Sequence, residues 1–432
     1  MVVVYFCGSF RQTAFMPRRY AAAAALSLSL AGFSAAASGF DSNPPTARTL
    51  GLGGASVAYT RSLAGLVSNP GLLGHWADSV TRVEISFGGQ VRRSSFLSAD
   101  TRRQTNQQLT PLPTGSLLAT FAVSKRVALG LALTTPYGYN TRWPADWAGR
   151  SVSRESRLLV AFVQPTVGVR LTDNFSLGAG LVYGYGAVRQ TRALGQYDDP
   201  AAASTLTASG GGFGANAGVY GRTGDNLSFG ISYRTGLDLT MTDGEATFTG
   251  VPARDADRLP ARTSLRHTRR LPSTLALGIT NQVNQQILVT FDFVLSGWSR
   301  LDSLNYALAA AGAAPAQTLR EGRRLEDALA FRAGIEYGAT PALTLRAGLR
   351  YDETPVRDEY ITPDFVDANL LGGSLGLSYN LGSRLTLDAG YGLEVGGERT
   401  ARVMPTNERI ANIAGTYRTL VQRAALGLSV RF

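Results

Sequence analysis

The feature that most constrains the fold is a two-residue alternation of apolar with small or polar side chains, which recurs from about residue 80 onward. In the segment 385–395 every odd-numbered residue is apolar, whereas the even-numbered residues are Thr, Asp, Gly, Gly and Glu. Successive side chains of a β-strand point to opposite faces, so this pattern predicts strands with one apolar face. Roughly 14 such segments, separated alternately by short turns and long loops, are typical of a transmembrane β-barrel.

Two features favour a barrel in lipid over a soluble β-sandwich. Aromatic residues stand near the strand ends, as at Tyr337, Tyr351 and Tyr391, where membrane barrels carry aromatic girdles. The chain ends on Phe432, which is similar to the C-terminal assembly signal of bacterial outer-membrane barrels. We therefore expect an all-β, transmembrane antiparallel barrel in the bacterial outer membrane, with the barrel-assembly machinery as a partner.

The N-terminal segment has the features of a signal peptide. Residues 18–19 are both arginine, residues 20–33 are apolar, and residues 35–37 are alanines of the kind found at cleavage sites. The mature chain would then begin near Ser38, and Met16 would be the true initiator. After the apolar segment no run of about 18 apolar residues occurs, so a closed barrel is the structure that could cross a membrane.

The stretch from residue 48 to residue 74 is rich in Gly, Ala and Ser and has neither a strand period nor a clear helix period. Gly53 and Gly54 allow left-handed backbone and close approach, and Asn69-Pro70-Gly71 is turn chemistry. We expect this stretch to be a plug inside the barrel, although an irregular N-terminal lead-in would show the same composition. The predicted domains are a signal peptide over residues 1–37, a plug over 38–78 and the barrel over 79–432.

Charged residues on the strand faces opposite the apolar side would point into the barrel lumen. Buried charges of both signs normally form pairs, and such a network would hold the plug. The alternative is that one of the arginines binds a substrate carboxylate through its planar guanidinium. The candidate lumen charges are Asp292, Arg332, Glu336, Arg346, Arg350, Asp388, Glu394 and Arg423.

The sequence offers little material for catalysis, for a metal site or for a cofactor. Cys7 is the one cysteine and lies in the predicted signal peptide, while His75 and His267 are the two histidines. A nucleophilic site needs a base and an acid within reach of a hydroxyl or thiol, and neither histidine faces a patterned serine. The net charge of +11 comes without a nucleic-acid motif, so we expect no nucleic-acid partner and assign the surplus arginine to outer-membrane lipid and lipopolysaccharide.

Several short motifs occur along the chain in a consistent order. They lie at residues 48–59, 68–71, 136–150, 164–180, 292–299 and 352–369. The set resembles the FadL/TodX family of outer-membrane transporters for long-chain fatty acids and other hydrophobic compounds. The sequence departs from the family pattern at Gly71, where members typically have Ala, and in residues 365–369, where the usual acidic motif is degraded.

The resemblance implies a path for a hydrophobic ligand. It implies capture at the third and fourth external loops, here near residues 190–212 and 236–272, and passage to a site beside the plug. The ligand would leave sideways through a gap at a kinked third strand, here residues 126–135. The residues assigned to this kink and gap are Gly130, Pro136, Tyr137 and Gly138, because Gly and Pro weaken a strand ladder.

We expect a monomeric, non-enzymatic channel for passive uptake of hydrophobic compounds, most simply long-chain fatty acids, with aromatic hydrocarbons as the other ligand class. The alternatives are a secretion-system component or surface scaffold of the same architecture, and a polar porin, against which the plug argues. Two loops carry further expectations. The Ala-rich stretch 301–314 predicts a short helix over the barrel mouth, and the arginine-rich stretch 255–270 predicts a solvated loop or a contact with lipopolysaccharide phosphate.

Overall fold

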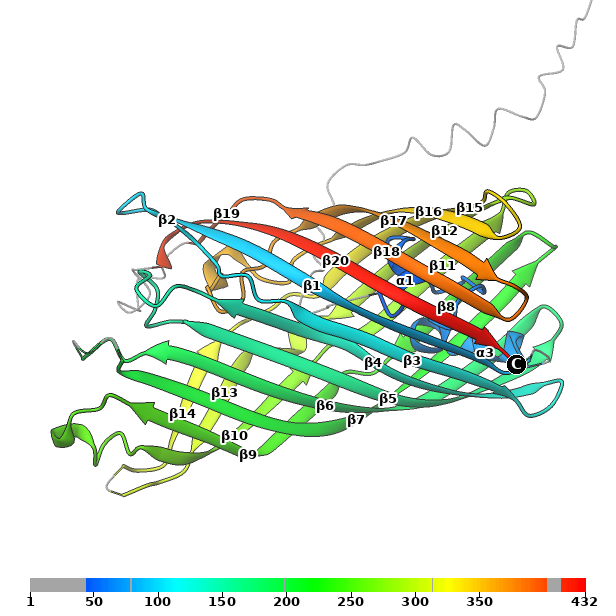
Figure 1. The fold of residues 1–432 in the computed structure, drawn as a ribbon. Coiled ribbons are helices and arrows are strands. Elements are labelled where there is room, and N and C mark those ends of the chain that lie inside the picture. The colour runs from blue at the N-terminus through cyan, green and yellow to red at the C-terminus, as the bar shows by residue number, and fades with distance from the viewer. Residues whose placement is uncertain (1–43, 78–79, 198, 200, 313, 402–412) are drawn as a thin grey trace, which may run out of the picture. The chain divides into compact units, whose positions relative to one another are not determined.

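The computed structural model describes residues 44–77, 80–197, 199, 201–312, 314–401 and 413–432. The expected signal peptide and the choice of Met16 as initiator lie outside the described residues. Within the described ranges the strands form one sheet of 20 strands. Figure 1 shows that most of them wrap into a barrel. Six strands lie outside the ring, which leaves 14 in the barrel wall, and this confirms the expected fold class.

All neighbouring strands in the wall are antiparallel, and β1 pairs with β20 from Arg82↔Arg431 to Ser98↔Gly415, which closes the ring. The wall strands, in ring order, are β1 (Arg82–Ser98), β3 (Leu112–Ala122), β4 (Val127–Arg142), β5 (Glu155–Thr172), β6 (Phe175–Ala193), β7 (Ala203–Thr223), β8 (Leu227–Arg234), β11 (Ser273–Gln282), β12 (Ile287–Gly297), β15 (Ala328–Gly338), β16 (Leu343–Asp352), β17 (Leu370–Leu381), β18 (Leu385–Gly396) and β20 (Gly415–Arg431).

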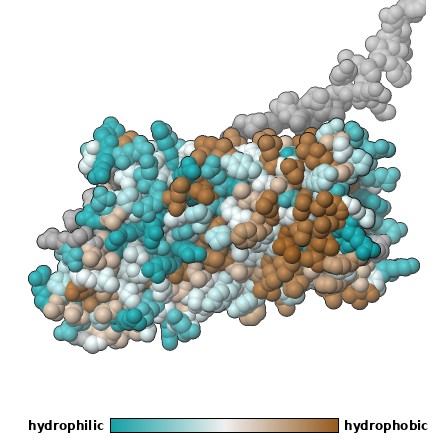
Figure 2. Space-filling model, viewed as in Figure 1, coloured by the Kyte–Doolittle hydropathy of each residue, from teal (hydrophilic) through white to brown (hydrophobic). Residues whose placement is uncertain are grey.

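The outward face of the wall is apolar, as lipid requires. Side chains such as Phe87, Leu181 and Phe213 are 71%, 65% and 78% exposed on this face. Figure 2 shows apolar residues gathered toward one end of the barrel and polar residues at the end where the long loops lie. A soluble sandwich would bury such side chains, so their exposure over many strands supports the membrane assignment. Among the described residues no helix is long and apolar enough to span a membrane.

The sheet continues beyond the wall at the loop end. The additional strands are β2 (Gln104–Asn106), β9 (Leu237–Thr249), β10 (Arg262–Leu271), β13 (Ser303–Leu308), β14 (Gln317–Gly322) and β19 (Arg399–Ala401), with single 3₁₀ turns η1 (Ala253–Asp255), η2 (Trp298–Arg300) and η3 (Asp358–Tyr360). The strands that extend into this end are longer than the roughly 9–11 residues that cross a bilayer, as β7 with 21 residues shows. The third and fourth external connections are largely strand because they pair with one another above the wall.

The expected helix over residues 301–314 is wrong. The segment Ser303–Leu308 is β13, which pairs with β10 and β14. Leu304, Tyr306 and Leu308 are buried, whereas the residues between them are not. This alternation of buried and exposed residues is typical of a strand. The segment forms a strand because the neighbouring strands offer hydrogen-bond partners for its backbone, which outweighs the helix propensity of the alanines. The stretch 255–270 likewise ends in a strand, β10, rather than forming one loop.

Residues 44–77 fill the interior of the barrel and are called the plug below. They contain the short helices α1 (Ala47–Leu50), α2 (Gly65–Ser68) and α3 (Gly71–His75). Helix α1 packs on β17 and β18, and α3 packs on β5, β6 and β7. Small residues on both sides permit this packing: a Cβ atom added at Gly178 of β6 would lie 2.0 Å from the carbonyl oxygen of Pro70.

Candidate functional site

The plug is held by carboxylates that project inward from the wall. Asp292 on β12 accepts hydrogen bonds from the backbone N–H groups of Ser56 and Val57, at 2.6 and 3.0 Å. Glu84 on β1 accepts one from the N–H of Leu63, at 2.7 Å. Both carboxylates are buried. Charge-assisted bonds to backbone donors are among the stronger hydrogen bonds, so these two acids fix the plug at separate points.

A second anchor is a buried cluster around Glu336. Its carboxylate lies 2.7 Å from the Nε of Arg346 on the neighbouring strand and 2.5 Å from a guanidinium nitrogen of Arg61 in the plug. The hydroxyl of Tyr59, also in the plug, donates to the same carboxylate at 2.5 Å. One wall acid therefore joins a wall arginine to two plug side chains.

Asp388 on β18 forms a third anchor. The guanidinium of Arg48 in α1 donates to both carboxylate oxygens, at 3.1 and 2.9 Å, which is the two-point geometry that arginine and carboxylate favour. Ser378 on β17 also donates to Asp388. Arg346 lies 4.0 Å from Asp388, so the second and third anchors form one network.

The remaining predicted lumen charges also lie inside the wall. Arg423 is paired with Glu394 and donates to Gln90, and Arg350 is paired with Asp352. Arg332 is half-buried and its guanidinium lies 3.5 Å from the carbonyl oxygen of Gly54. Direct contacts with the plug support the interpretation that Asp292, Glu336 and Asp388 hold it, whereas Arg423 and Arg350 pair with acids of the wall.

The residues of the predicted plug turn have definite contacts. Asn69 donates to the carbonyl oxygens of Val57 and Val219, both at 2.9 Å, and accepts from the N–H of Gly71 at 3.0 Å. Asn69 thereby ties the plug to β7. Pro70 stands at the N-terminal end of α3, and a Cβ added at Gly71 would lie 2.7 Å from a backbone nitrogen of β7.

The two glycines earlier in the plug both have left-handed backbone, with φ of +67° at Gly53 and +93° at Gly54. The N–H of Gly53 donates to Ser374 on β17 at 3.0 Å. A Cβ at Gly53 would lie 2.4 Å from the carbonyl oxygen of Leu349, so glycine is required there by conformation and by space.

A cavity of about 120 Å³ lies between the plug and the wall on the side of β4, β8, β11 and β12. Most of its lining is apolar or weakly polar, with Tyr137, Tyr233 and Trp298 as its aromatic members. Arg234, Arg332 and Asp352 are its charged members. An apolar cavity with a few polar groups is the usual form of a small-molecule site.

Arg234, the last residue of β8, differs from the other charges around this cavity. Its guanidinium donates to the hydroxyl of Tyr137 and to that of Thr274, the latter at 3.0 Å. It lies 5.4 Å from the ring centres of Tyr137 and Phe162. Among the described residues no carboxylate pairs with it, and its Nε is buried without an acceptor. The site therefore contains a positive charge that is held in place by the aromatic rings of Tyr137 and Phe162.

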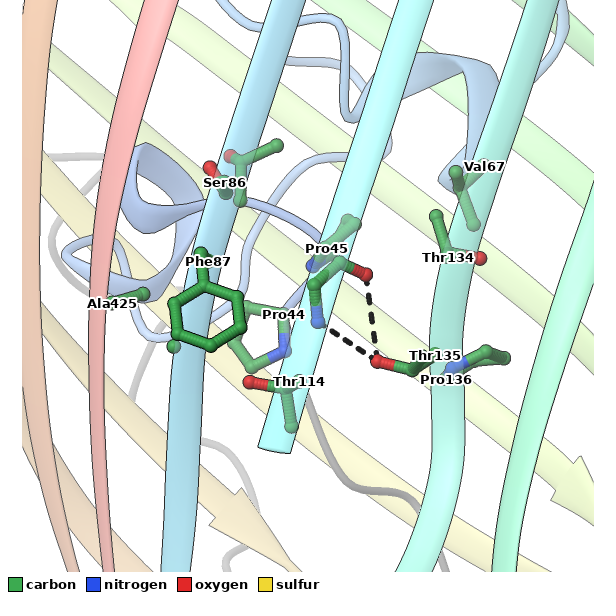
Figure 3. Close-up of a pocket in the computed structure, with 13 residues that line it drawn as sticks. Pro44, Pro45, Val67, Ser86, Phe87, Thr114, Thr134, Thr135, Pro136 and Ala425 are labelled. Atoms are coloured by element: carbon green, nitrogen blue, oxygen red, sulfur yellow. Dashed lines mark hydrogen bonds between the residues drawn. The ribbon is translucent and has the colours of Figure 1, made fainter. Parts of the chain in front are cut away.

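The wall is interrupted beside this cavity. The β3–β4 ladder ends at Ser116↔Thr134, and β4 has a register shift between Thr134 and Tyr137, where Pro136 stands. The hydroxyl of Thr135 spans the interruption, since it accepts from the N–H of Gly115 at 3.0 Å and lies 3.4 Å from the carbonyl oxygen of the same residue (Figure 3). Further toward the loop end, Thr110 donates to the carbonyl oxygen of Asn140 at 2.9 Å and closes the interruption.

A second cavity of about 50 Å³ lies at this interruption (Figure 3). Pro45, Val67 and Pro136 line both cavities, so the two are neighbours. The smaller one also touches Phe87, whose side chain is on the lipid-facing side of β1. The lining thus runs from the interior toward the lipid.

The structure places the predicted kink residues in two groups. Pro136, Tyr137 and Gly138 lie at or directly after the register shift. Gly130 does not: it pairs regularly with Thr120 and Thr166, and plug leucines pack against it. The assignment of Gly130 to the kink is therefore wrong. This glycine provides space for the plug, and the strand ladder on both sides of it is regular.

Several site residues escaped sequence reasoning. Arg234 and Thr135 stand at strand positions whose inward direction depends on where each strand ends and on the bulge in β4. Arg48, Arg61 and Glu84 were visible as charges near the plug stretch, but their partners are more than 20 residues away. Glu84 could have been found from the alternation in the first predicted strand, because its side chain points to the face opposite that of its apolar neighbour Ile85.

The loop end above the cavities is packed rather than open. Phe96, Trp143, Trp147 and Tyr417 belong to a buried cluster that joins the external strands, and the two tryptophan rings stack at 4.5 Å. Trp143 donates to the carbonyl oxygen of Pro363 at 2.9 Å, which ties two distant loops together. A ligand entering from this side must therefore pass between packed loops.

Two buried titratable groups belong to this loop end. His267 stacks on Tyr306 at 4.5 Å, and burial, followed by the nearby Arg269, lowers the pKa of His267 to about 4. For Asp364, burial alone would raise the pKa, but the charge of Arg323 at 2.5 Å and the hydrogen bonds from Arg323 and Thr362 together lower the pKa. Within the described ranges no three His, Cys, Asp or Glu side chains gather as a metal site requires.

The last residue of the chain, Phe432, lies at the short-turn end of β20. Its N–H donates to the carbonyl oxygen of Thr81 at 3.0 Å, and its side chain is 68% exposed. The aromatic ring is therefore exposed at the edge of the barrel wall.

A closed antiparallel barrel with an apolar outer band, a charged lumen and an internal plug defines the class of outer-membrane channel proteins. Residues 28–432 match the family model described as outer membrane protein transport protein (OMPP1/FadL/TodX), and the chain belongs to this family. The protein is thus located in the outer membrane. Because the family is one of transport proteins, membership supports a role other than catalysis.

Individual relatives are distant. Outer membrane protein P1 of Haemophilus influenzae is 23% identical over 308 residues, which are 62% of this chain and 63% of that protein. The chain thus spans less than two thirds of that relative. A Pseudomonas aeruginosa FadL homologue has a TM-score of 0.77 at 16% identity, covering 91% of this chain and 100% of the other. The Ralstonia pickettii toluene transporter TbuX has a TM-score of 0.67 at 19% identity, covering 91% and 99%. These likenesses establish the fold.

Proposed function

We propose that the protein is a channel for passive uptake of hydrophobic compounds that carry a carboxylate, with long-chain fatty acids as the simplest substrates. The observation that supports this most directly is Arg234, a half-buried guanidinium without a carboxylate partner among the described residues. It lines the cavity beside the plug, most of whose other residues are uncharged, with Arg332 and Asp352 as the exceptions. A carboxylate head group would supply the missing negative charge, while an acyl chain would follow the apolar lining.

The route out of this cavity is proposed to be lateral. The second cavity leads from the plug to the interruption between β3 and β4, where the Thr135 hydroxyl bridges to Gly115 and, further toward the loop end, Thr110 bonds to Asn140. A few side-chain hydrogen bonds open more readily than a strand ladder, because fewer hydrogen bonds must be broken together. Movement of Pro45 and Val67, which line both cavities, would join the two spaces.

The test is retention of ligands by the purified full-length barrel in detergent. The barrel is incubated with a mixture of fatty acids and neutral aromatic hydrocarbons and washed, and the organic extract is measured by mass spectrometry. We expect near-stoichiometric retention of carboxylates. In Arg234→Gln, loss of a charge-assisted hydrogen bond of about 1.5–3 kcal/mol corresponds to roughly 10- to 150-fold weaker binding.

Arg300→Gln is the matched control, because Arg300 is exposed at the barrel mouth and pairs with Asp238 at 3.2 Å, outside the cavity lining. This variant should retain carboxylates as the unchanged protein does. Retention of toluene in preference to carboxylates, unaffected by Arg234→Gln, would reassign the substrate class to neutral hydrocarbons. Retention of no hydrophobe, together with recovery of a stoichiometric protein partner, would favour the scaffold alternative.

A further inference from the structure

A cluster of outward-facing arginines lies at the upper edge of the lipid-facing band. Along β5 the outward residues are apolar from Leu171 up to Leu159, and the next outward residue is Arg157. Along β6 the same order holds, with Ala187 followed by Arg189. Both arginines are exposed. They stand where the apolar wall meets the polar loop end, which is the level of lipid head groups.

The cross-strand register sets these guanidiniums side by side. Arg157 is directly opposite Arg189, and Arg142 on β4 is directly opposite Glu155. Like charges directly opposite each other destabilise a sheet, so this arrangement needs a compensating anion. The protein supplies one: Glu155 lies 3.2 Å from Arg142 and 4.0 Å from the Nε of Arg189.

The single carboxylate of Glu155 does not neutralise the charge of the three guanidiniums. Arg142, Arg157, Arg189 and Glu155 together carry a net charge of +2. The side chain of Arg157 has no hydrogen bond or ion pair with any residue in the described ranges. Its five N–H donors are therefore available to a ligand that approaches from the membrane side.

This concentration of positive charge is local. On β15, six strands farther around the ring, the exposed residue beyond the outward-facing Leu329 is Asp327, an acid. On β20 the outward Arg418 is paired with Glu398. The surface formed by β4, β5 and β6 thus differs from those of β15 and β20. Below it Tyr185, 47% exposed, presents the kind of aromatic ring found at membrane interfaces.

We propose that Arg142, Arg157 and Arg189 bind a phosphate group of lipopolysaccharide in the outer leaflet. The long-loop end of the barrel faces outside, and lipopolysaccharide is the phosphate-bearing lipid of that leaflet. Planar guanidiniums match phosphate oxygens in pairs, and the acyl chains of the same molecule would lie along Leu159 and Tyr185. This site is separate from the arginine-rich stretch 255–270, and it does not depend on the channel function.

The test measures binding of lipid A to the purified full-length barrel by native mass spectrometry, with the folded state verified by heat-modifiable migration in gels. Lipid A with both phosphates should remain bound, and lipid A with its phosphates removed should bind at least tenfold more weakly. The double variant Arg157→Gln, Arg189→Gln should bind phosphorylated lipid A at least tenfold more weakly than the unchanged protein. The double variant Arg157→Lys, Arg189→Lys keeps both positive charges but loses the paired guanidinium donors. Its affinity for phosphorylated lipid A should lie between that of the unchanged protein and that of the double Gln variant.

The matched control is the double variant Arg93→Gln, Arg418→Gln, which removes the same charge from exposed positions at the same level on β1 and β20. It should bind phosphorylated lipid A within twofold of the unchanged protein. An equal loss of affinity in both double variants would show that lipid A is attracted by any exposed arginine at this level of the barrel, and this would overturn the proposal. Competition by phosphatidylglycerol vesicles as effective as that by lipid A would overturn the assignment to lipopolysaccharide.

Discussion

Removing the carboxylate of Asp292 is expected to loosen the plug without opening the barrel. One oxygen of this buried group accepts both the Ser56 and the Val57 N–H, at 2.6 and 3.0 Å. In Asp292→Ala both donors lose their acceptor in a buried site, at a cost of about 1–3 kcal/mol each. Part of this is offset because the carboxylate is no longer desolvated, so we take about 3 kcal/mol, or roughly 100-fold more frequent local opening.

The assay is hydrogen exchange of the folded barrel in detergent, followed by mass spectrometry of peptides that cover residues 50–60. These peptides should exchange roughly 100-fold faster in Asp292→Ala, whereas peptides from β12 should not change, because its backbone ladder with β11 and β15 is intact. Asp292→Asn keeps an acceptor oxygen and should show a much smaller effect, and Asp302→Ala, in an exposed loop pair, should show none. Unchanged exchange in residues 50–60, or equal acceleration across the barrel, would refute the anchor assignment.

Three further predictions follow from the geometry. In Gly115→Cys, Thr135→Cys, oxidation should close the wall interruption and stop uptake while ligand binding persists, and reductant should restore transport; transport that continues through the oxidised form would exclude this exit. Because the pKa of His267 is about 4 when folded and about 6.5 when free, the unfolded loop end binds protons more readily, so its stability is full above pH 6.5 and falls by on the order of 3 kcal/mol toward pH 4. His267→Phe should remove this dependence in limited proteolysis at graded pH. Gly178→Ala should lower the barrel melting temperature by displacing the plug, whereas Gly397→Ala, with open space around it, should not.

The barrel wall was predictable because its signal is local. The period of two in segments such as 385–395 reports which side chains face lipid, and any strand with that pattern must bury one face and expose the other. The inward direction of Asp292, Glu336 and Asp388 followed from the same count. The helix expected at 301–314 failed because alanine content is a weak propensity, which pairing with β10 and β14 overrode.

The candidate site depended on contacts between residues far apart in sequence. Among the described residues Arg234 has no carboxylate partner, since Asp292 is engaged by the plug and Asp352 pairs with Arg350. The opening beside it depends on where the β3–β4 ladder stops, a register that the sequence of either strand alone does not specify. Thus the alternation of side chains determined the barrel, the membrane and the inward charges, because it acts within each strand. Tertiary structure decided which charges are paired, where the wall is interrupted and which cavity lies beside it, because each depends on strands and plug meeting in one register.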